Sequence, residues 1–234
     1  MLSVGCWWIR DGLNARRREA RRFGERLEER PNVRWEQDHG DSEVLRSHFL
    51  HDPGRDEEVD RVDFMYMCSH GDYNPSNSAT YGRGFMCWDG AVHCTDDIEW
   101  GNFDLEFFSS HACRLLYHSS SNSVGRWVSA FGRLHYMFGF HTISTSGGVS
   151  AYRGKKFARY SSRHFDGYNS RTMRRAWKKA CVETESNSKE WAYLRANGNR
   201  SGGAWVDTYN EVLSSSEPGD PTTAREFFTA RGNC

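Results

Sequence analysis

Four short segments of the chain consist almost entirely of apolar residues. Their apolar side chains stand at consecutive positions, a pattern typical of strands that are covered on both faces of a parallel sheet. We therefore predict that these segments are neighbouring strands of one sheet. They lie near residues 3–9, 62–68, 104–109 and 134–140.

Between these segments the apolar residues recur at helical spacing. Within residues 13–29, Ala15, Ala20, Phe23 and Leu27 form one stripe in a strongly charged background, which predicts an amphipathic helix. Further elements are expected as helices near residues 42–49, 124–131, 151–162 and 172–186, a second strand from Val33, and a strand or hairpin arm at 84–88 that turns at Asp89-Gly90.

This succession of elements predicts an α/β fold with three layers, in which a mostly parallel sheet is flanked by helices. At 234 residues the chain is long enough for one such domain with a full core. The C-terminal part is rich in Gly, Ser, Thr and Pro, so we expect an irregular extension from about residue 187. The predicted organisation is therefore a single domain over residues 1–234.

The balance of basic and acidic residues bears on which classes of partner the chain can bind. The chain has 31 basic and 31 acidic residues, so no global field attracts nucleic acid or an anionic membrane, and we expect neither as a partner. The helix at 13–29 holds a cluster of arginines, but acidic residues interleave with them, which favours a solvated helix face over a nucleic-acid patch. The cluster consists of Arg16, Arg17, Arg18, Arg21 and Arg22.

The distribution of cysteines and of hydrophobic residues bears on location. No apolar run approaches the length of a membrane span, and the amino terminus lacks the features of a secretory signal. Seven cysteines are scattered without a disulfide framework, which is typical of a reducing compartment. The sequence therefore predicts a cytoplasmic protein whose thiols are mostly buried.

Two of the predicted strands end in residues that can carry chemistry. One ends in Ser69-His70-Gly71 and another in His111-Ala112-Cys113. Because the carboxyl ends of parallel strands meet at one edge of a sheet, where sites commonly form, we expect His70 and Cys113 to lie close together. A thiol reacts as the thiolate, and a nearby histidine can act as its base. Gly71 has no Cβ, so its backbone can approach a developing oxyanion.

These two strand ends resemble the caspase–gingipain–legumain group of cysteine peptidases. Ala112-Cys113-Arg114 is similar to the caspase nucleophile motif, and the separation of 43 positions from His70 to Cys113 is close to the caspase spacing of about 50. The resemblance covers roughly residues 1–148. It implies a caspase-like fold, Cys113 as nucleophile, His70 as base or acid, and the amides of Gly71 and Cys113 as oxyanion donors. It implies no cofactor and no metal.

The resemblance also implies where a substrate would be selected. In these families the pocket for the residue before the scissile bond draws on the loop after the first strand, which here holds Arg10 and Asp11. Arg10 would select an acidic group and Asp11 a basic one. The alternative is that Asp11-Gly12 is only a turn and that Arg10 is solvated. His111 and Thr142, at the ends of two other strands, are further candidate substrate contacts. The alternative for His111 is that it is a structural or rim residue.

Other readings of the same residues stay open. A zinc site from Cys87, His93, Cys94, His111 and Cys113 is disfavoured, because the spacing between Cys87 and Cys94 is not that of a zinc knuckle. The thiols of Cys68, Cys87, Cys94 and Cys181 are expected to be buried as small apolar groups.

Two functions follow from the candidate site. The first is a cysteine-dependent enzyme that acts on an amide or acyl centre, as a peptidase, a transpeptidase or a cyclising enzyme. The second is a non-peptidase on the same scaffold, a small-molecule-binding protein or an acid–base enzyme such as a biosynthetic cyclase. The substrate would accordingly be a peptide or a small molecule. Aromatic residues near the strand ends would suit a flat ligand or would serve only in packing: Tyr73, Tyr81, Trp88, Trp100 and Tyr117.

Overall fold

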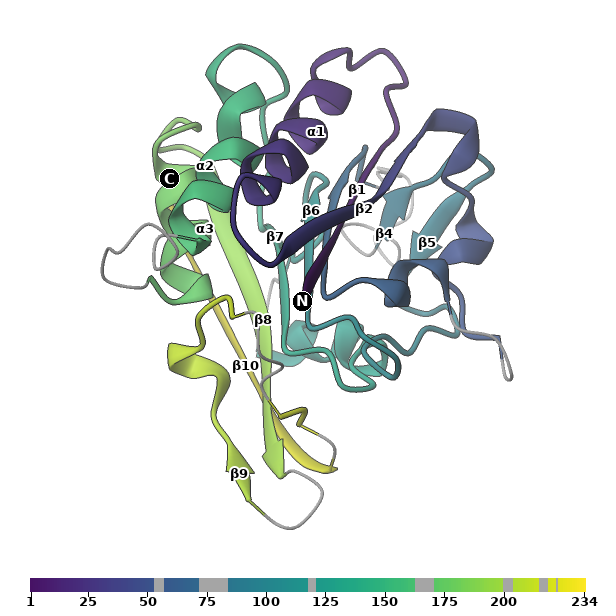
Figure 1. The fold of residues 1–234 in the computed structure, drawn as a ribbon, viewed down its shortest axis with the longest axis vertical. Coiled ribbons are helices and arrows are strands. Elements are labelled where there is room, and N and C mark those ends of the chain that lie inside the picture. Colours follow the sequence, from purple (N-terminus) through teal and green to yellow (C-terminus); the bar gives the residue numbers. More distant parts are fainter. Residues whose placement is uncertain are drawn as a thin grey trace.

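The computed structural model describes most of the chain and shows one large mixed sheet (Figure 1). The described residues are 1–52, 57–71, 84–117, 121–162, 171–199, 204–214, 219–221 and 223–234.

Five adjacent parallel strands form the larger part of this sheet and reach one of its edges. The spatial order is β10-β8-β7-β6-β3-β1-β2, with β9 paired to β8. The four strands predicted from apolar runs lie side by side as β1, β3, β6 and β7, so the prediction of a mostly parallel sheet is confirmed. The parallel strands are β1 (Leu2–Trp8), β2 (Val33–Gly40), β3 (Phe64–Cys68), β6 (Phe107–His111) and β7 (Tyr136–Phe140).

Three α-helices cover one face of the sheet. They are α1 (Ala15–Glu28), α2 (Arg153–Ser161) and α3 (Met173–Val182), close to the expected ranges. Aromatic rings dominate the core between helices and sheet: Phe23 of α1 stacks on Tyr66 of β3 with ring centroids 4.6 Å apart, and Phe157 of α2 meets Trp177 of α3 at 5.1 Å. Such ring pairs bury more area than aliphatic pairs, which compensates for the low hydrophobic content.

The opposite face is covered by 3-10 turns, loops and a hairpin. Strands β4 (Gly84–Met86) and β5 (Ala91–His93) form the expected hairpin around Asp89 and Gly90. The fully buried Trp100 packs here against Phe108 of β6 at 4.6 Å between centroids. Within the described residues, the 3-10 turns are Asp41–Glu43, Arg46–His48, Glu58–Arg61, Ser121–Ala130, Gly148–Tyr152 and Thr208–Asn210, of which the last two pack against the α-helices instead.

Two expected helices are 3-10 segments instead. The segment at 42–49 forms two separate turns, and the one at 124–131 is the 3-10 stretch Ser121–Ala130. Gly125 in that stretch and the short apolar pattern of the first segment give weak support for a continuous α-helix.

The expectation of an irregular C-terminal extension is wrong. Strands β8 (Glu190–Asn199) and β10 (Thr223–Asn233) are the longest in the sheet and pair antiparallel, with β8 also antiparallel to β7. Figure 1 shows both extending well past the other strands. In β8, Trp191 and Tyr193 join the helix-side core while Ala192 and Leu194 join the other core, which is strand alternation.

Among the described residues, no helix combines the length and the apolar character that a bilayer crossing needs.

Candidate active site at the carboxyl edge of the sheet

The two predicted chemical residues follow neighbouring strands. Cys68, the last residue of β3, pairs in register with His111, the last residue of β6, and His70 and Cys113 each come two residues later. Gly71 contacts the turn after β6 directly, because a Cβ built on Gly71 would lie 1.9 Å from the carbonyl oxygen of Cys113. The two strand ends are therefore in backbone contact, as expected for parallel neighbours.

The thiol of Cys113 lies against the loop that follows β7. Its Sγ is 3.7 Å from the carbonyl oxygen of Ser144 and 3.7 Å from the Ser144 Oγ. Within the described residues, no hydrogen bond joins Cys113 to His70. Cys113 and Cys234 are half-buried, whereas the other five cysteines are buried, which confirms the expectation for Cys68, Cys87, Cys94 and Cys181.

His70 is held by the loop after β1. Its Nε2 lies 3.1 Å from the carbonyl oxygen of Asp11. A carbonyl can only accept a hydrogen bond, so this contact places the ring proton on Nε2 and leaves Nδ1 of the neutral imidazole as the basic nitrogen. The Asp11 backbone has a φ of 32° and that of Gly12 a φ of 77°, a tight left-handed turn that brings this carbonyl to the imidazole.

The turn that carries Cys113 is fixed by main-chain contacts. Arg114 has a φ of 57°, in the left-handed region, and its N–H donates to the carbonyl of Thr142 at 3.0 Å. The Thr142 hydroxyl accepts from the N–H of Glu190 at 2.8 Å. Thr142, predicted as a substrate contact, thus joins the Cys113 turn to β8.

The loop after β1 also contains Arg10 and Asp11, the residues predicted to select the substrate. The Arg10 side chain, half of which is exposed, pairs with Asp41 through an Nε–Oδ2 distance of 2.5 Å, and its N–H donates to Asp41 Oδ1 at 2.8 Å. Arg10 is therefore not a solvated, unpaired cation. Asp11 is exposed, at the edge next to His70.

His111 does not reach a substrate, which corrects that prediction. Its side chain is completely buried on the helix side, and its Nδ1 lies 2.7 Å from Glu19 Oε2 of α1. Burial lowers the pKa of His111 well below its usual value, and the nearby guanidinium groups of Arg153 and Arg16 lower it further. The imidazole is neutral and structural.

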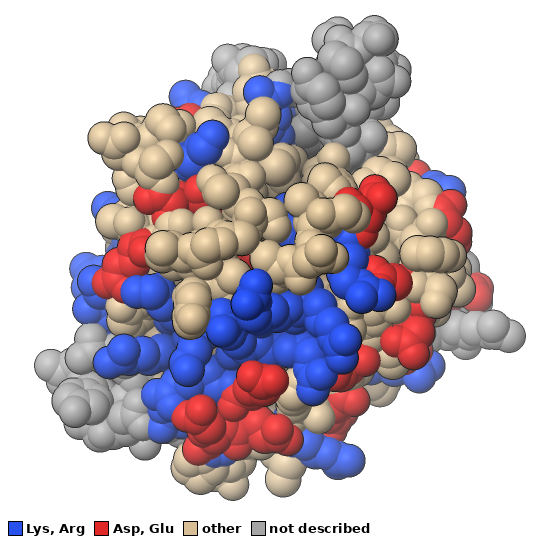
Figure 2. Space-filling model, turned by 90° about the horizontal axis from the view of Figure 1, so that it is seen from above, with Lys and Arg blue, Asp and Glu red and all other residues tan. Residues whose placement is uncertain are grey.

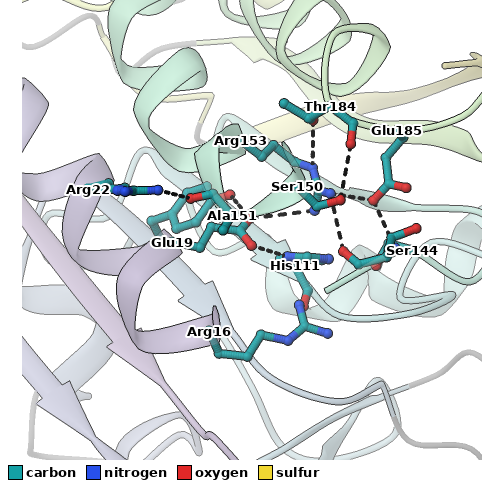
Figure 3. Close-up of polar contacts among 12 residues, drawn as sticks. Arg16, Glu19, Arg22, His111, Ser144, Ser150, Ala151, Arg153, Thr184 and Glu185 are labelled. Carbon is teal, nitrogen blue, oxygen red and sulfur yellow. Dashed lines mark hydrogen bonds and ion pairs between the residues drawn. The ribbon is translucent and has the colours of Figure 1, made fainter. Parts of the chain in front are cut away.

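Glu19 belongs to a cluster of buried charged residues beneath the candidate site. This buried polar cluster comprises Arg16, Glu19, His111, Arg153 and Glu185, and Figure 3 shows its members converging from α1, β6, α2 and the segment after α3. Arg16 Nη1 donates to the carbonyl of His111 at 2.6 Å. Arg153 pairs with Glu19 at 3.5 Å and with Glu185.

The same arginine reaches the loop that carries Ser144. Arg153 Nη2 donates to the carbonyl of Thr145 at 3.5 Å, and its Nε donates to Thr184 Oγ1 at 3.3 Å. The cluster therefore hydrogen-bonds to both segments that flank the Cys113 thiol: the end of β6 at His111 and the loop that holds Ser144 and Thr145. Sequence inspection missed it, although Arg16 and Glu19 stand at helical spacing with the apolar Ala20 and Phe23, and that spacing was the available signal.

Three donor atoms of this region lie close enough to bind a cation. Glu19, Cys68 and His111 have ligand atoms within 4.8 Å of one another, the one such group among the described residues. The guanidinium groups of Arg16 and Arg153 neutralise the same carboxylate, and burial raises the pKa of the Cys68 thiol well above its usual value. This donor set suits an internal ion-pair network better than a cation site.

The aromatic candidates divide between core and surface. Trp100 is fully buried, Trp88 is exposed, and Tyr117 stacks on His141 with centroids 4.9 Å apart. Tyr73 and Tyr81, within the predicted rim loop 72–83, lie outside the described residues.

Comparison with known proteins gives one match. A family model described as "Domain of unknown function (DUF6345)" matches residues 6–232. Neither the curated proteins nor the solved structures contain a significant match to the chain.

Proposed function

The chain belongs to the DUF6345 family, and we propose that it is a cysteine-dependent enzyme of caspase-like fold that attacks an amide or acyl centre through Cys113. His70 is the base, and the amides of Gly71 and Cys113 stabilise the oxyanion. The substrate is a peptide or a related acyl compound.

One observation carries this proposal. The carbonyl of Asp11 accepts a hydrogen bond from Nε2 of His70. This contact fixes the tautomer, so that Nδ1 is the nitrogen that can accept a proton before any substrate binds. A base that is oriented by a third group, at the same sheet edge as the nucleophile, is one part of the arrangement that nucleophilic catalysis uses. Here the third group is a backbone carbonyl, which no side-chain pattern reveals.

The sheet supports the same assignment. His70 and Cys113 follow adjacent parallel strands in the middle of the sheet, and the helix layer lies on one face. Contact between Gly71 and the Cys113 backbone brings these two residues, and hence their amides, close together. In the proposed site both N–H groups donate to the carbonyl oxygen of the bound substrate, which is the role of an oxyanion hole.

The reaction begins with the thiol proton moving to Nδ1 of His70 and the Cys113 sulfur bonding to the substrate carbonyl carbon. The tetrahedral oxyanion collapses, the carbon–nitrogen bond breaks, and the leaving amine takes the proton from His70. The product is a thioester on Cys113. Attack by water then gives hydrolysis, and attack by an amine gives transpeptidation or cyclisation, with His70 removing a proton from the incoming nucleophile.

The resting thiol contacts Ser144 and not His70. The proposed mechanism requires a rotation about the Cys113 side chain that brings the sulfur toward the base, and catalytic hydrogen bonds are commonly loose before substrate binds. In this account, the Ser144 contact is the resting position of the nucleophile.

An activated ester tests the proposal without knowledge of the substrate. With p-nitrophenyl acetate, we expect a burst of nitrophenolate with one equivalent of acetyl on Cys113 in the intact mass, followed by slower turnover. Cys113→Ala should remove the burst, and His70→Ala should slow both phases by about a hundredfold or more.

The control is Cys234→Ala, which removes the other half-buried thiol. Its pKa is lowered by a hydrogen bond with Cys181, so it reports on thiol reactivity without a base. A burst that persists in Cys113→Ala, or an acetyl group found on Cys234, would reject Cys113 as the nucleophile and favour the non-peptidase alternative.

A further inference from the structure

We propose that an arginine patch on α1 binds an acidic segment of the polypeptide substrate. The patch consists of Arg17, Arg18, Arg21 and Arg22. This inference names the class of substrate and thus rests on the proposed function, but binding can be measured without turnover.

The four arginines line a hollow in the surface. Its volume is about 270 Å³, and Asn14 and Glu25 complete its wall. Figure 2 looks down on the carboxyl edge of the sheet and shows Lys and Arg side chains gathered in a patch near the middle of this face, beside a group of acidic side chains. A net charge of zero for the whole chain therefore conceals a local excess of positive charge.

Aromatic rings hold three of the guanidinium groups in place. Arg17 lies over the ring of Trp8 at 5.8 Å, and Arg21 lies over Trp35 at 5.5 Å. Arg22 lies over Tyr152 at 3.9 Å, and its Nη1 donates to the carbonyl of Ala151 at 3.2 Å. A ring supports the face of a guanidinium and leaves its N–H edge available, so these donors are ordered before an anion arrives.

Few carboxylates of the protein itself lie beside the arginines of this patch. Asp38 of β2 lies 3.4 Å from Arg21 Nε, with both side chains about one-third exposed. Glu25 is the one carboxylate among the described residues that line the hollow. Arg17 and Arg18 are exposed, and a partner that brings carboxylates to them would form charge-assisted, bidentate hydrogen bonds.

The size of the patch favours an acidic peptide over nucleic acid. The five steps from Arg17 to Arg22 rise by about 8 Å along the helix. Beyond them the helix presents Glu25, Glu28 and Glu29. A duplex carries a charge about every 1.7 Å and would extend over these carboxylates, whereas a peptide can end its acidic run within the patch.

The patch lies within reach of the candidate site. Trp8, which supports Arg17, is the last residue of β1 and pairs with Cys68, and Cys68 pairs with His111 just before Cys113. The backbones of Trp8 and His111 are therefore two strand spacings apart, about 10 Å, which about three extended residues span, and the arginines lie somewhat further from Cys113 than this. A single peptide can therefore occupy the patch with its acidic residues and present a nearby bond to Cys113.

Binding is best measured on Cys113→Ala, which cannot turn over substrate. A fluorescein-labelled peptide with a run of Glu residues should bind, whereas the same peptide with Gln in place of Glu should not. Adding Arg17→Glu and Arg18→Glu together should weaken the Glu peptide roughly tenfold or more. Arg34→Glu is the matched control, since this exposed arginine on β2 lies on the other face of the strand from Trp35, and it should change affinity by less than about twofold.

Each alternative result overturns the inference in a different way. Equal affinity for the Glu and Gln peptides, or no loss on reversal of Arg17 and Arg18, removes the acidic segment as the ligand. A short DNA duplex that binds more tightly and loses affinity with the same reversals makes nucleic acid the ligand. If the parent protein shows no ester burst at Cys113 but Cys113→Ala still binds the Glu peptide, the proposed chemistry is rejected and the patch remains only a binding surface.

Discussion

The carbonyl oxygen of Asp11 lies 3.1 Å from Nε2 of His70. The loop after the first strand thus contributes a main-chain acceptor to the candidate site, whatever its side chains contribute to selection. The residue that provides it must adopt a left-handed backbone, with φ of 32°.

The variants Asp11→Asn and Asp11→Pro separate the backbone role from the side-chain role. Asparagine tolerates the left-handed region and keeps the carbonyl, so the ester burst at Cys113 should change by less than about threefold. Proline fixes φ near −65° and should displace the carbonyl and slow the burst at least tenfold. Equal rates for the two variants would show that this carbonyl does not orient His70. A changed preference between charged peptides in Asp11→Asn would assign selection to the carboxylate.

Gly71→Ala should disturb the nucleophile turn from the neighbouring strand. Its Cβ would lie 1.9 Å from Cys113 O and 2.8 Å from Cys113 C, backbone atoms that cannot yield as a flexible side chain would. We expect a loss of about 1–3 kcal/mol in the free energy of unfolding, typical of overpacking, together with loss of the ester burst. Urea unfolding and burst amplitude measure the two effects. A variant as stable and active as the parent would show that the strand ends are further apart.

Arg153→Met should be strongly destabilising, because it removes the buried cation that pairs with both the Glu19 and the Glu185 carboxylates. Removal of one member of a buried ion pair costs about 3–5 kcal/mol. Lys155→Met, an exposed position in the same helix, controls for the change in helix composition. A loss in Arg153→Met no larger than that in Lys155→Met would mean that the cluster contributes little to stability.

His135 makes stability depend on pH at the opposite edge of the sheet. Burial opposes its charge, but the Glu211 carboxylate, 2.6 Å from Nδ1, and Asp220 raise the pKa of His135 to about 10. A raised histidine pKa stabilises the fold fully below the ordinary value of about 6.5, and this contribution is lost as pH rises toward 10. His135→Gln should therefore cost most at pH 6 and least near pH 10 in urea unfolding. His39→Gln on β2 controls for loss of an imidazole, and a cost independent of pH would contradict the charged state.

The parallel part of the fold was predictable from the sequence because strands buried on both faces leave continuous apolar runs. Those runs also located His70 and Cys113, since strand ends define the sheet edge. The antiparallel strands were missed for a physical reason. In β8 the face toward one core carries alanines such as Ala192 and Ala196, so its alternation is weak in the sequence although both faces are buried.

The supporting contacts of the site were not predictable because they join distant parts of the chain. Glu19 and His111 are 92 residues apart, and Arg153 and Glu19 are 134 apart. His111 was predicted as a candidate substrate contact at the end of a strand, but strand alternation turns its side chain toward the helix layer. The Asp11 carbonyl belongs to the main chain and leaves no side-chain signature.

The central claim is that His70 activates Cys113. The most direct test is the rate of Cys113 alkylation by iodoacetamide at neutral pH, followed by peptide mass mapping in the parent and in His70→Ala. Cys234 in the same molecule serves as the internal reference. The account predicts that Cys113 reacts much faster than Cys234 in the parent, and that His70→Ala slows Cys113 at least tenfold while Cys234 is unchanged. Equal rates for Cys113 in the two proteins would contradict it.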